Sequence, residues 1–268
     1  MMRFADHVVV VRGGGDLATG VVARLHRAGF PVVVAEIEPP LAVRRTVAVA
    51  SAVTTGEVEV EDVVGRRVDD PVVAIAVARQ GIVPVVVGAD LPVLPQPPEI
   101  VVDARMAKRN IDTSTEDAPL VVALGPGFVA GVDCHAVVET MRGPRLGRVM
   151  WSGSAAADTG MPGRLGGEDE QRLVRAEAVG RVDWLVDIGD HVVRDQAIGR
   201  VGAVTVRALT GGVVRGLITP GFAATPGLKL GDIDPRADRT ACFEISDKAL
   251  AVGGGVLEAV LTHLNRPA

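Results

Sequence analysis

The segment His7–Glu38 most constrains the fold of this chain, because it has the pattern of a strand, a glycine turn, a helix and a second strand. Val8–Val11 is an unbroken β-branched run, which is typical of a parallel strand buried on both faces. Gly13–Gly15 follow, and apolar residues then recur at helical spacing as far as Gly29, which ends the helix. Val32–Ala35 is a second buried run. The segment therefore predicts the first βαβ unit of a Rossmann-like parallel sheet.

The turn in this segment matches the dinucleotide-binding pattern, as Gly13-x-Gly15-x-x-Ala18. Gly13 would form the tight turn, and Gly15 would let a phosphate approach the backbone at the N-terminus of the helix. Glu36 lies about 20 residues further on, where an acid that binds a ribose belongs. Asp16 places a negative charge at the mouth of this site. Two interpretations of the pattern therefore remain: a nucleotide-binding turn, and a glycine-rich turn that is needed only for close packing.

Other candidate ligand-binding residues follow the later predicted strands, at the edge where ligands bind in open α/β sheets. Arg44 and Arg45 come shortly after the second strand, where they could bind a phosphate or pair with the acids that end that strand. Arg105 follows a strand predicted over 100–103, and a Gly-Pro-Gly turn follows another predicted over 120–124. The predicted cofactor-binding residues are Gly13, Gly14, Gly15, Asp16, Thr19, Glu36, Arg44, Arg45, Arg105, Gly125 and Gly127.

Composition excludes several classes of function. The 268 residues carry a net charge of -5 without a basic block, so no nucleic-acid footprint is present. The apolar fraction of 48% is that of a soluble globular protein. Cys134 and Cys242 do not form a disulfide framework by count alone, so the reducing cytoplasm is the expected location. Neither a signal peptide nor a membrane span is expected.

Local signals divide the chain into parts. Residues 1–140 are predicted to form the Rossmann-like ligand-binding domain, and residues 141–240 a β-rich module of short antiparallel strands. Within the first part, residues 41–49 predict a short helix and then a short strand. Residues 241–268 form a C-terminal helical segment, in which Gly253–Gly255 precede an amphipathic helix that packs on the first domain.

The β-rich module contains an internal repeat. A shift of 32 residues places Gly180 on Gly212 and Gly189 on Gly221, and the spacing holds through both copies without an insertion or deletion. The repeated strand-turn-strand unit resembles the barrel-sandwich hybrid of lipoyl and biotinyl domains. Those carriers are modified on a lysine in the hairpin between the halves. The equivalent hairpin, 201–206, contains no lysine, so attached lipoate or biotin is excluded and the module is expected to be structural or to bind a partner.

Few residues carry an obvious chemistry. Cys134 beside His135 could be a nucleophile or a soft metal ligand. Adjacent strand residues point to opposite faces, which favours a buried cysteine beside an exposed histidine. The histidines lack metal-ligand spacing, and no metal site is predicted. The turn Gly231–Arg236 combines two acids and an arginine, either as internal ion pairs or as a site at the domain junction.

Several segments form a more specific set. They are Arg12–Gly20, Glu36–Thr46, Asp103–Met106, Gly125–Phe128, Val138–Gly143, Gly231–Arg236, Ile245–Ala249 and Gly253–Glu258. As a set they resemble the selenium-dependent molybdenum hydroxylase system proteins, an accessory family encoded beside molybdenum hydroxylases, and the resemblance covers nearly the whole chain. The plan is also distantly similar to that of xanthine dehydrogenase accessory proteins, which have a Rossmann domain and handle the pterin cofactor.

The resemblance implies a role in the maturation of a molybdenum hydroxylase, with that enzyme or its maturation machinery as partner. The ligand is then a nucleotide or the molybdopterin-type cofactor itself, and assembly into a homo-oligomer is compatible with this role. Maturation involves placing a terminal sulfur or selenium on the metal. Cys134 is accordingly the predicted catalytic thiol. It is expected to be accessible from the same crevice at the sheet edge as Gly15 and Gly127, with a pKa lowered by Arg142 and Arg145, whereas Cys242 is expected to be buried.

Two alternatives from other classes stay open. The same glycines, with Glu36 on the ribose, fit an NAD(P)-dependent oxidoreductase of a small molecule. The chain could instead be a non-catalytic binding module in which the hybrid barrel recruits the hydroxylase.

Overall fold

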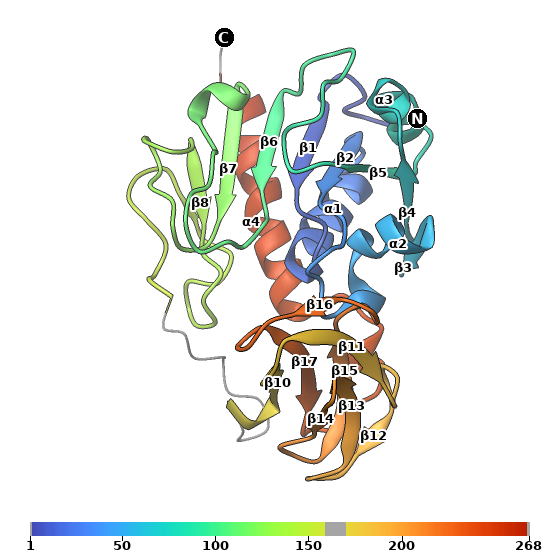
Figure 1. Ribbon diagram of the computed structural model, residues 1–268. Helices are drawn as coiled ribbons and strands as arrows, with labels where there is room; N and C mark the ends of the chain where they lie inside the picture. Colours follow the sequence, from blue (N-terminus) through green and yellow to red (C-terminus); the bar gives the residue numbers. More distant parts are fainter. Residues whose placement is uncertain (1, 159–169, 267–268) are drawn as a thin grey trace. The chain divides into compact units, whose positions relative to one another are not determined.

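The computed structural model describes residues 2–158 and 170–266. The chain forms two compact units, which are described separately. The first consists of Met1–Glu38, Val49–Asp158 and Ile245–Ala268, and the second of Pro39–Ala48 and Thr159–Glu244. The protein is mixed α/β, with one large, mostly parallel sheet, two further antiparallel sheets and a long C-terminal helix (Figure 1).

The first unit is built on a nine-stranded sheet in the order β3-β4-β5-β2-β1-β6-β7-β8-β9. Its strands are β1 (Val9–Arg12), β2 (Val32–Glu36), β3 (Glu57–Val60), β4 (Val63–Val68), β5 (Val83–Val87), β6 (Ile100–Asp103), β7 (Leu120–Leu124), β8 (Ala136–Val138) and β9 (Val149–Met150). Only the outermost pairs, β3 with β4 and β8 with β9, are antiparallel. The chain leaves β1 towards β2 and later returns to its other side with β6, so the strand order reverses at β1. Ligands in open α/β sheets bind at the carboxyl ends of the strands beside such a reversal.

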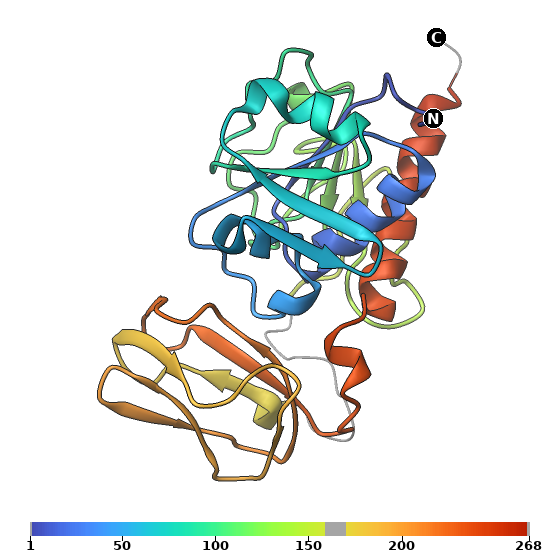
Figure 2. The ribbon, with the colours of Figure 1, turned by 90° about the vertical axis from the view of Figure 1, so that its right-hand side faces the viewer.

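Helices cover both faces of this sheet. They are α1 (Asp16–Ala28), α2 (Ala52–Thr55), α3 (Ala74–Arg79) and α4 (Asp247–Leu264). Helices α1 and α4 lie side by side on one face (Figure 1 and Figure 2). Side chains that point to the other face, among them Val10 and Val101, pack with Ala74 and Ala78 of α3. Because successive strand residues alternate between the faces, the unbroken valine runs fill both layers of core.

Helix α4 contains the glycine run that the sequence placed before the helix. Ser246 caps its N-terminus by accepting a hydrogen bond from the backbone of Ala249, so the helix begins ahead of Gly253–Gly255. A Cβ at Gly253 would overlap the backbone of Gly20 in α1, and a Cβ at Gly20 would overlap Ala249. The glycines allow the two helices to approach closely, and this tertiary packing outweighs the low helix propensity of glycine.

The segment 41–49 differs from its prediction of a short helix followed by a strand. It forms bends and 3-10 turns, with η1 (Arg45–Val47) leading into η2 (Val49–Ser51). The backbone N–H of Val49 donates to the hydroxyl of Thr19, and that of Ala50 to the carbonyl of Gly14. These backbone groups are therefore satisfied by the glycine turn, not by a sheet.

The second unit consists of two four-stranded antiparallel sheets, β10-β17-β15-β12 and β14-β13-β11-β16. The strands are β10 (Leu173–Arg175), β11 (Gly180–Trp184), β12 (His191–Val192), β13 (Ala197–Val201), β14 (Val204–Arg207), β15 (Gly212–Leu217), β16 (Ala223–Ala224) and β17 (Lys229–Asp234). Apolar side chains of both sheets, including Val182, Ile198, Val214 and Leu230, form one core.

The repeat found in the sequence is present in this strand pairing. Strands β10 to β13 form one copy and β14 to β17 the other, and exchanging equivalent strands converts the order of one sheet into that of the other. Gly180 of β11 pairs with Ala224 of β16, and the equivalent residues Gly212 and Val192 also pair. Each copy therefore contributes strands to both sheets, in matching registers.

Within the described part of the chain, no helix has the length and apolar character needed to cross a membrane.

Candidate functional site

The glycine turn lies at the carboxyl end of β1, where the strand order reverses. Gly13 has a φ of 92°, which side chains rarely adopt, and a Cβ there would lie 3.1 Å from the backbone of Ala104 and Arg105. A Cβ at Gly14 would lie 2.9 Å from the backbone nitrogen of Ala50. Close packing thus requires glycine at both positions, whether or not a ligand binds.

Gly15 is different, because it borders open space. A Cβ built there meets no heavy atom within 4 Å, and the φ of −69° is accessible to any residue. Gly15 is the N-cap of the 13-residue helix α1, and no side chain caps the helix. The first N–H groups of a helix have no intrahelical acceptor and form its positive end. The turn therefore offers backbone donors to an approaching group, next to the negative charge of Asp16 in the first helical turn.

Thr19 is fully buried and holds the turn together. Its hydroxyl donates to the carbonyl of Gly15 at 2.9 Å and accepts from the backbone nitrogen of Val49 at 3.0 Å. These contacts fix the segment that follows β2 against the glycine turn. Direct ligand contact by Thr19 stays a prediction.

Glu36 ends β2 and lies against the same turn. Its Oε2 accepts a hydrogen bond from the backbone nitrogen of Gly14, and its Oε1 one from that of Ile37, both at 2.8 Å. Burial raises the pKa of this carboxyl, and the two N–H groups offset part of the shift. Each carboxylate oxygen has further acceptor capacity. The group can therefore accept hydrogen bonds from the paired hydroxyls of a ribose, as the acid after the second strand does in dinucleotide-binding folds.

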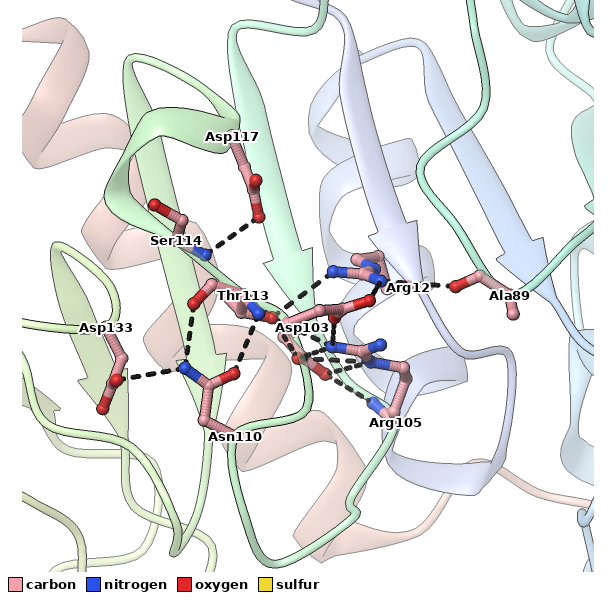
Figure 3. Close-up of polar contacts among 10 residues, drawn as sticks. Arg12, Ala89, Asp103, Arg105, Asn110, Thr113, Ser114, Asp117 and Asp133 are labelled. Atoms are coloured by element: carbon pink, nitrogen blue, oxygen red, sulfur yellow. Dashed lines mark hydrogen bonds and ion pairs between the residues drawn. The ribbon is translucent and has the colours of Figure 1, made fainter.

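A charged cluster lies beside the turn, where β1 and β6 end (Figure 3). Arg12 and Asp103 are register partners in these strands and are only 3% and 2% exposed. Arg105 donates to the Asp103 carboxylate from Nε at 3.2 Å and from Nη2 at 2.6 Å. The hydroxyl of Thr113 donates to the same carboxylate at 2.6 Å. Asp103 therefore fixes the orientation of Arg105.

Asp112 connects the two arginines of this cluster. Its Oδ2 accepts from Nη2 of Arg12 at 2.8 Å, and its Oδ1 from Nη2 of Arg105 at 2.7 Å. The hydrogen bond from Arg12 is the main reason that the pKa of Asp112 falls to about 2. Burial lowers the pKa of Arg105, but its hydrogen bonds to Asp103 and Asp112 outweigh this effect and raise it. Arg105 and Asp112 are therefore both charged at neutral pH.

Asn110 fixes the loop that carries Asp112 (Figure 3). Its Nδ2 donates to the carbonyl of Thr113 at 2.9 Å and to Oδ1 of Asp133 at 3.0 Å, and its Oδ1 accepts from the nitrogen of Thr113 at 2.8 Å. Oδ2 of Asp133 accepts from the nitrogen of Val129 at 2.7 Å. The loops that follow β6 and β7 are thus held together at the carboxyl edge.

The Gly-Pro-Gly turn after β7 also packs closely. Gly125 and Gly127 have φ values of 73° and 102°. A Cβ at Gly125 would meet the Thr140 hydroxyl, and one at Gly127 would meet the backbone of Arg109. The carbonyl of Gly127 accepts from the nitrogen of Asn110 at 3.0 Å. The turn is therefore part of the same edge as the charged cluster, and its contact with a ligand stays a prediction.

Arg44 and Arg45 belong to the second unit and donate to its backbone. Nη2 of Arg44 lies 2.8 Å from the carbonyl oxygen of Ala241, and Nε of Arg45 lies 2.6 Å from that of Leu217. Burial lowers the pKa of Arg45. The structure does not group these arginines with the glycine turn in one unit, so phosphate binding by them stays a prediction.

Cys134 lies in the core of the first unit, where its side chain is 0% exposed. Burial raises the pKa of the thiol to about 12. Nδ1 of His135 is held by the backbone nitrogen of Val121 at 2.9 Å. The accessible, acidified thiol expected of a sulfur carrier is therefore not found, because the chain directs Cys134 into the core, where the protonated thiol is inert.

Sequence reasoning selected Arg105 but missed most of the cluster around it. The sequence feature that could have indicated the cluster is that two apolar strands each end in a charged residue, Arg12 and Asp103. Asn110, Asp112 and Thr113 lie in an irregular loop whose pattern predicts no contact. Among the described residues, no group of three or more His, Cys, Asp or Glu side chains could hold a metal ion.

Comparison with known proteins adds one clear relative. The chain is 45% identical over 260 residues to the uncharacterized protein YqeB of Escherichia coli (strain K12). The match covers 97% of this chain and 48% of YqeB, so the chain spans about half the length of that relative. No model of a known protein family matches the chain.

Solved structures give only weak likenesses. The ectoine utilization protein EutE (DoeB) from Ruegeria pomeroyi matches at a TM-score of 0.24 and 21% identity, over 31% of this chain and 28% of that one. A succinylglutamatedesuccinylase/aspartoacylase from Rhodobacter sphaeroides matches at a TM-score of 0.28 and 15% identity, over 85% and 84%. Neither score carries an argument about fold or function.

Proposed function

We propose that the first unit binds a nucleotide-like ligand at the carboxyl edge of its sheet, with a phosphate beside Gly15 and ribose hydroxyls at Glu36. The observation that carries this proposal is the Glu36 carboxylate on the N–H of Gly14, next to the open space at Gly15. A carboxylate there favours a ligand with paired hydroxyls as well as a phosphate. The ligand class is thus a nucleotide, or a pterin cofactor that carries such groups.

In this proposal the first unit is a Rossmann-like domain and the second is a barrel-sandwich-hybrid module. The reversal of strand order at β1 in the mostly parallel sheet supports the first assignment. The equivalent strand orders of the two antiparallel sheets, related by exchange of the two repeat copies, support the second. The turn of the β13–β14 hairpin is Gly202–Ala203, which offers no lysine for a prosthetic group. We therefore assign the module a structural or partner-binding role.

The biological role that we propose is maturation of a molybdenum hydroxylase, as an accessory protein in the cytoplasm. Its support is the set of motifs that resembles the selenium-dependent molybdenum hydroxylase system proteins. Gene deletion is expected to leave the hydroxylase protein present but inactive, and complementation to restore it. Full hydroxylase activity in the deletion strain would remove this role and leave ligand binding unaffected.

Ligand binding is tested best at Gly15, because a side chain there fills the open space without strain. Gly15→Val is expected to keep the fold and to weaken binding of ADP, NADH or molybdopterin by about tenfold or more, measured by calorimetry. Gly254→Ala is the matched control, since Gly254 also has nothing within 4 Å of its Cβ position but lies in α4. Equal affinity in both variants and the wild type would contradict the proposed site.

An NAD(P)-dependent oxidoreductase is the second candidate, favoured by the position of Glu36. The carboxylate would repel the 2′-phosphate of NADPH, so this function requires a preference for NADH. Titration with both dinucleotides tests it. Equal binding of NADPH and NADH, or no binding of either, would exclude the oxidoreductase.

A further inference from the structure

Asp112 is the most accessible member of a charged group whose other members are buried or partly buried. Its side chain is 42% exposed, whereas those of Arg12 and Arg105 are 3% and 17% exposed. Each of its two oxygens accepts from a different guanidinium. The carboxylate between the two cations is therefore the member of the group that solvent reaches most.

Arg12 depends on this anion. Its other contacts are the carbonyl of Ala89 at 3.3 Å and the hydroxyl of Thr113 at 3.5 Å. Its Nε is buried and has no hydrogen-bond partner in the described part of the chain. Asp103 is already bound by Arg105 through two nitrogens. Because a buried guanidinium without an anion is unfavourable, Arg12 favours a negative group at the position of the Asp112 carboxylate.

The Asp112 side chain is 42% exposed, and Asn110 holds the neighbouring Thr113 through both its nitrogen and its carbonyl. A rotation about the Cα–Cβ bond of Asp112 would therefore take the carboxylate out of this position while Thr113 stays held. The vacated position lies at the carboxyl edge, where the backbone of Arg105 is 3.1 Å from a Cβ built on Gly13. Paired guanidinium groups match the oxygens of a phosphate.

We propose that Arg12 and Arg105 form a phosphate-binding site that the Asp112 carboxylate fills until a ligand phosphate displaces it. This inference rests on the proposed function, because the phosphate belongs to the ligand at the same edge. Asp112 acts as an internal competitor: it keeps the arginines neutralised in the free protein and lowers the affinity for every phosphate ligand by the free energy of its own contacts.

The test uses the full chain and pyrophosphate as the probe. Asp112→Asn is expected to bind pyrophosphate about tenfold or more tightly than the wild type by calorimetry, because the competing charge is gone. Asp62→Asn is the matched control, since Asp62 is also an exposed carboxylate paired with an arginine, Arg27, and its removal changes the net charge equally. Adding Arg12→Gln to Asp112→Asn should abolish the gain.

A measurement on the wild type covers the case in which Arg12→Gln does not fold. Carbon-13 NMR of the Asp112 carboxyl is expected to show its pKa rise from about 2 towards the ordinary value when pyrophosphate saturates the protein. An Asp112 titration that pyrophosphate leaves unchanged, or an Asp112→Asn affinity equal to that of the wild type, would overturn the inference.

The outcomes separate this inference from the proposed function. If ADP binds the wild type and Asp112→Asn equally and loses affinity only with Gly15→Val, the nucleotide site stands and the displacement inference is wrong. If Asp112→Asn gains affinity for pyrophosphate while ADP binds neither protein, the phosphate site stands and the nucleotide proposal is wrong.

Discussion

The Glu36 carboxylate accepts a hydrogen bond from the backbone nitrogen of Gly14 at 2.8 Å, so the end of β2 closes onto the turn that follows β1. A second buried contact, between Thr19 and Val49, ties the segment after β2 to the same turn. The glycine turn is therefore supported from two sides while Gly15 itself borders open space. This arrangement fixes the backbone donors of the turn, which in the proposed function would reduce the entropy lost when a ligand binds.

Glu36→Gln is expected to change how stability depends on pH. Burial raises the folded-state pKa of Glu36 above its unfolded value. The favourable contribution of the protonated carboxyl is fully present below the unfolded pKa and is lost as pH rises through the folded pKa. The unfolding free energy of the wild type, relative to that of Glu36→Gln, should therefore fall as pH rises above the ordinary pKa of a glutamate, about 4.3.

Urea unfolding measures this difference, with Trp151 as the reporter of the first unit in a Trp184→Phe background. Glu57→Gln serves as control, because the Glu57 carboxylate is exposed and pairs with Arg66 on the surface. If the difference in unfolding free energy between wild type and Glu36→Gln does not change with pH, burial does not raise the pKa of the Glu36 carboxyl.

Thr19→Val should destabilise the first unit by about 1–3 kcal/mol, because it leaves the buried N–H of Val49 without its acceptor. Valine has nearly the shape of threonine, so the loss reports the hydrogen bonds and not a cavity. Thr54→Val is the control: Thr54 is exposed in α2 and its hydroxyl only donates to the carbonyl of Ser51. Equal unfolding free energies for the two variants would contradict the anchoring role of Thr19.

The sequence predicted the regular parts of this fold well. The strands at 100–103 and 120–124 are present as β6 and β7. The pair Asp70-Pro71 also predicts a helix N-terminus, and the Asp70 side chain accepts from the nitrogen of Val72 in the 3-10 turn η3 (Pro71–Val73), which leads into α3. These features depend on local hydrophobic pattern and capping, which a single sequence contains. The helix α4 was predicted too short, because its glycines are explained only by contact with α1.

Much of the candidate site was not predictable for the same reason. Arg12 and Asp112 are 100 residues apart, and only the fold brings them within hydrogen-bond distance. The position of Cys134 was also ambiguous from sequence, since the side that faces the core depends on how the chain enters the sheet edge. Local pattern therefore located the glycine turn and Glu36, but not the charged cluster beside them.

Alanine at two adjacent glycines of α4 is expected to have opposite effects. Gly254→Ala should stabilise the protein by about 0.5–1 kcal/mol, because the position is helical and open. Gly253→Ala should destabilise it by about 1–3 kcal/mol, because the new Cβ would overlap the carbonyl of Gly20 and separate α1 from α4. Thermal unfolding measures both, and stabilisation by Gly253→Ala would show that the helices do not approach this closely.

The last prediction concerns thiol reactivity. Both Cys134 and Cys242 are buried, and burial raises the pKa of each thiol, that of Cys134 to about 12. Because the thiolate is the reactive form, neither cysteine should react with a thiol reagent at neutral pH in the native protein, and both should react in denaturant. If the proposed role in hydroxylase maturation holds, Cys134→Ala should leave that maturation intact. Rapid labelling of native Cys134, or loss of maturation in a folded Cys134→Ala variant, would support a catalytic role for Cys134, against the argument from its burial.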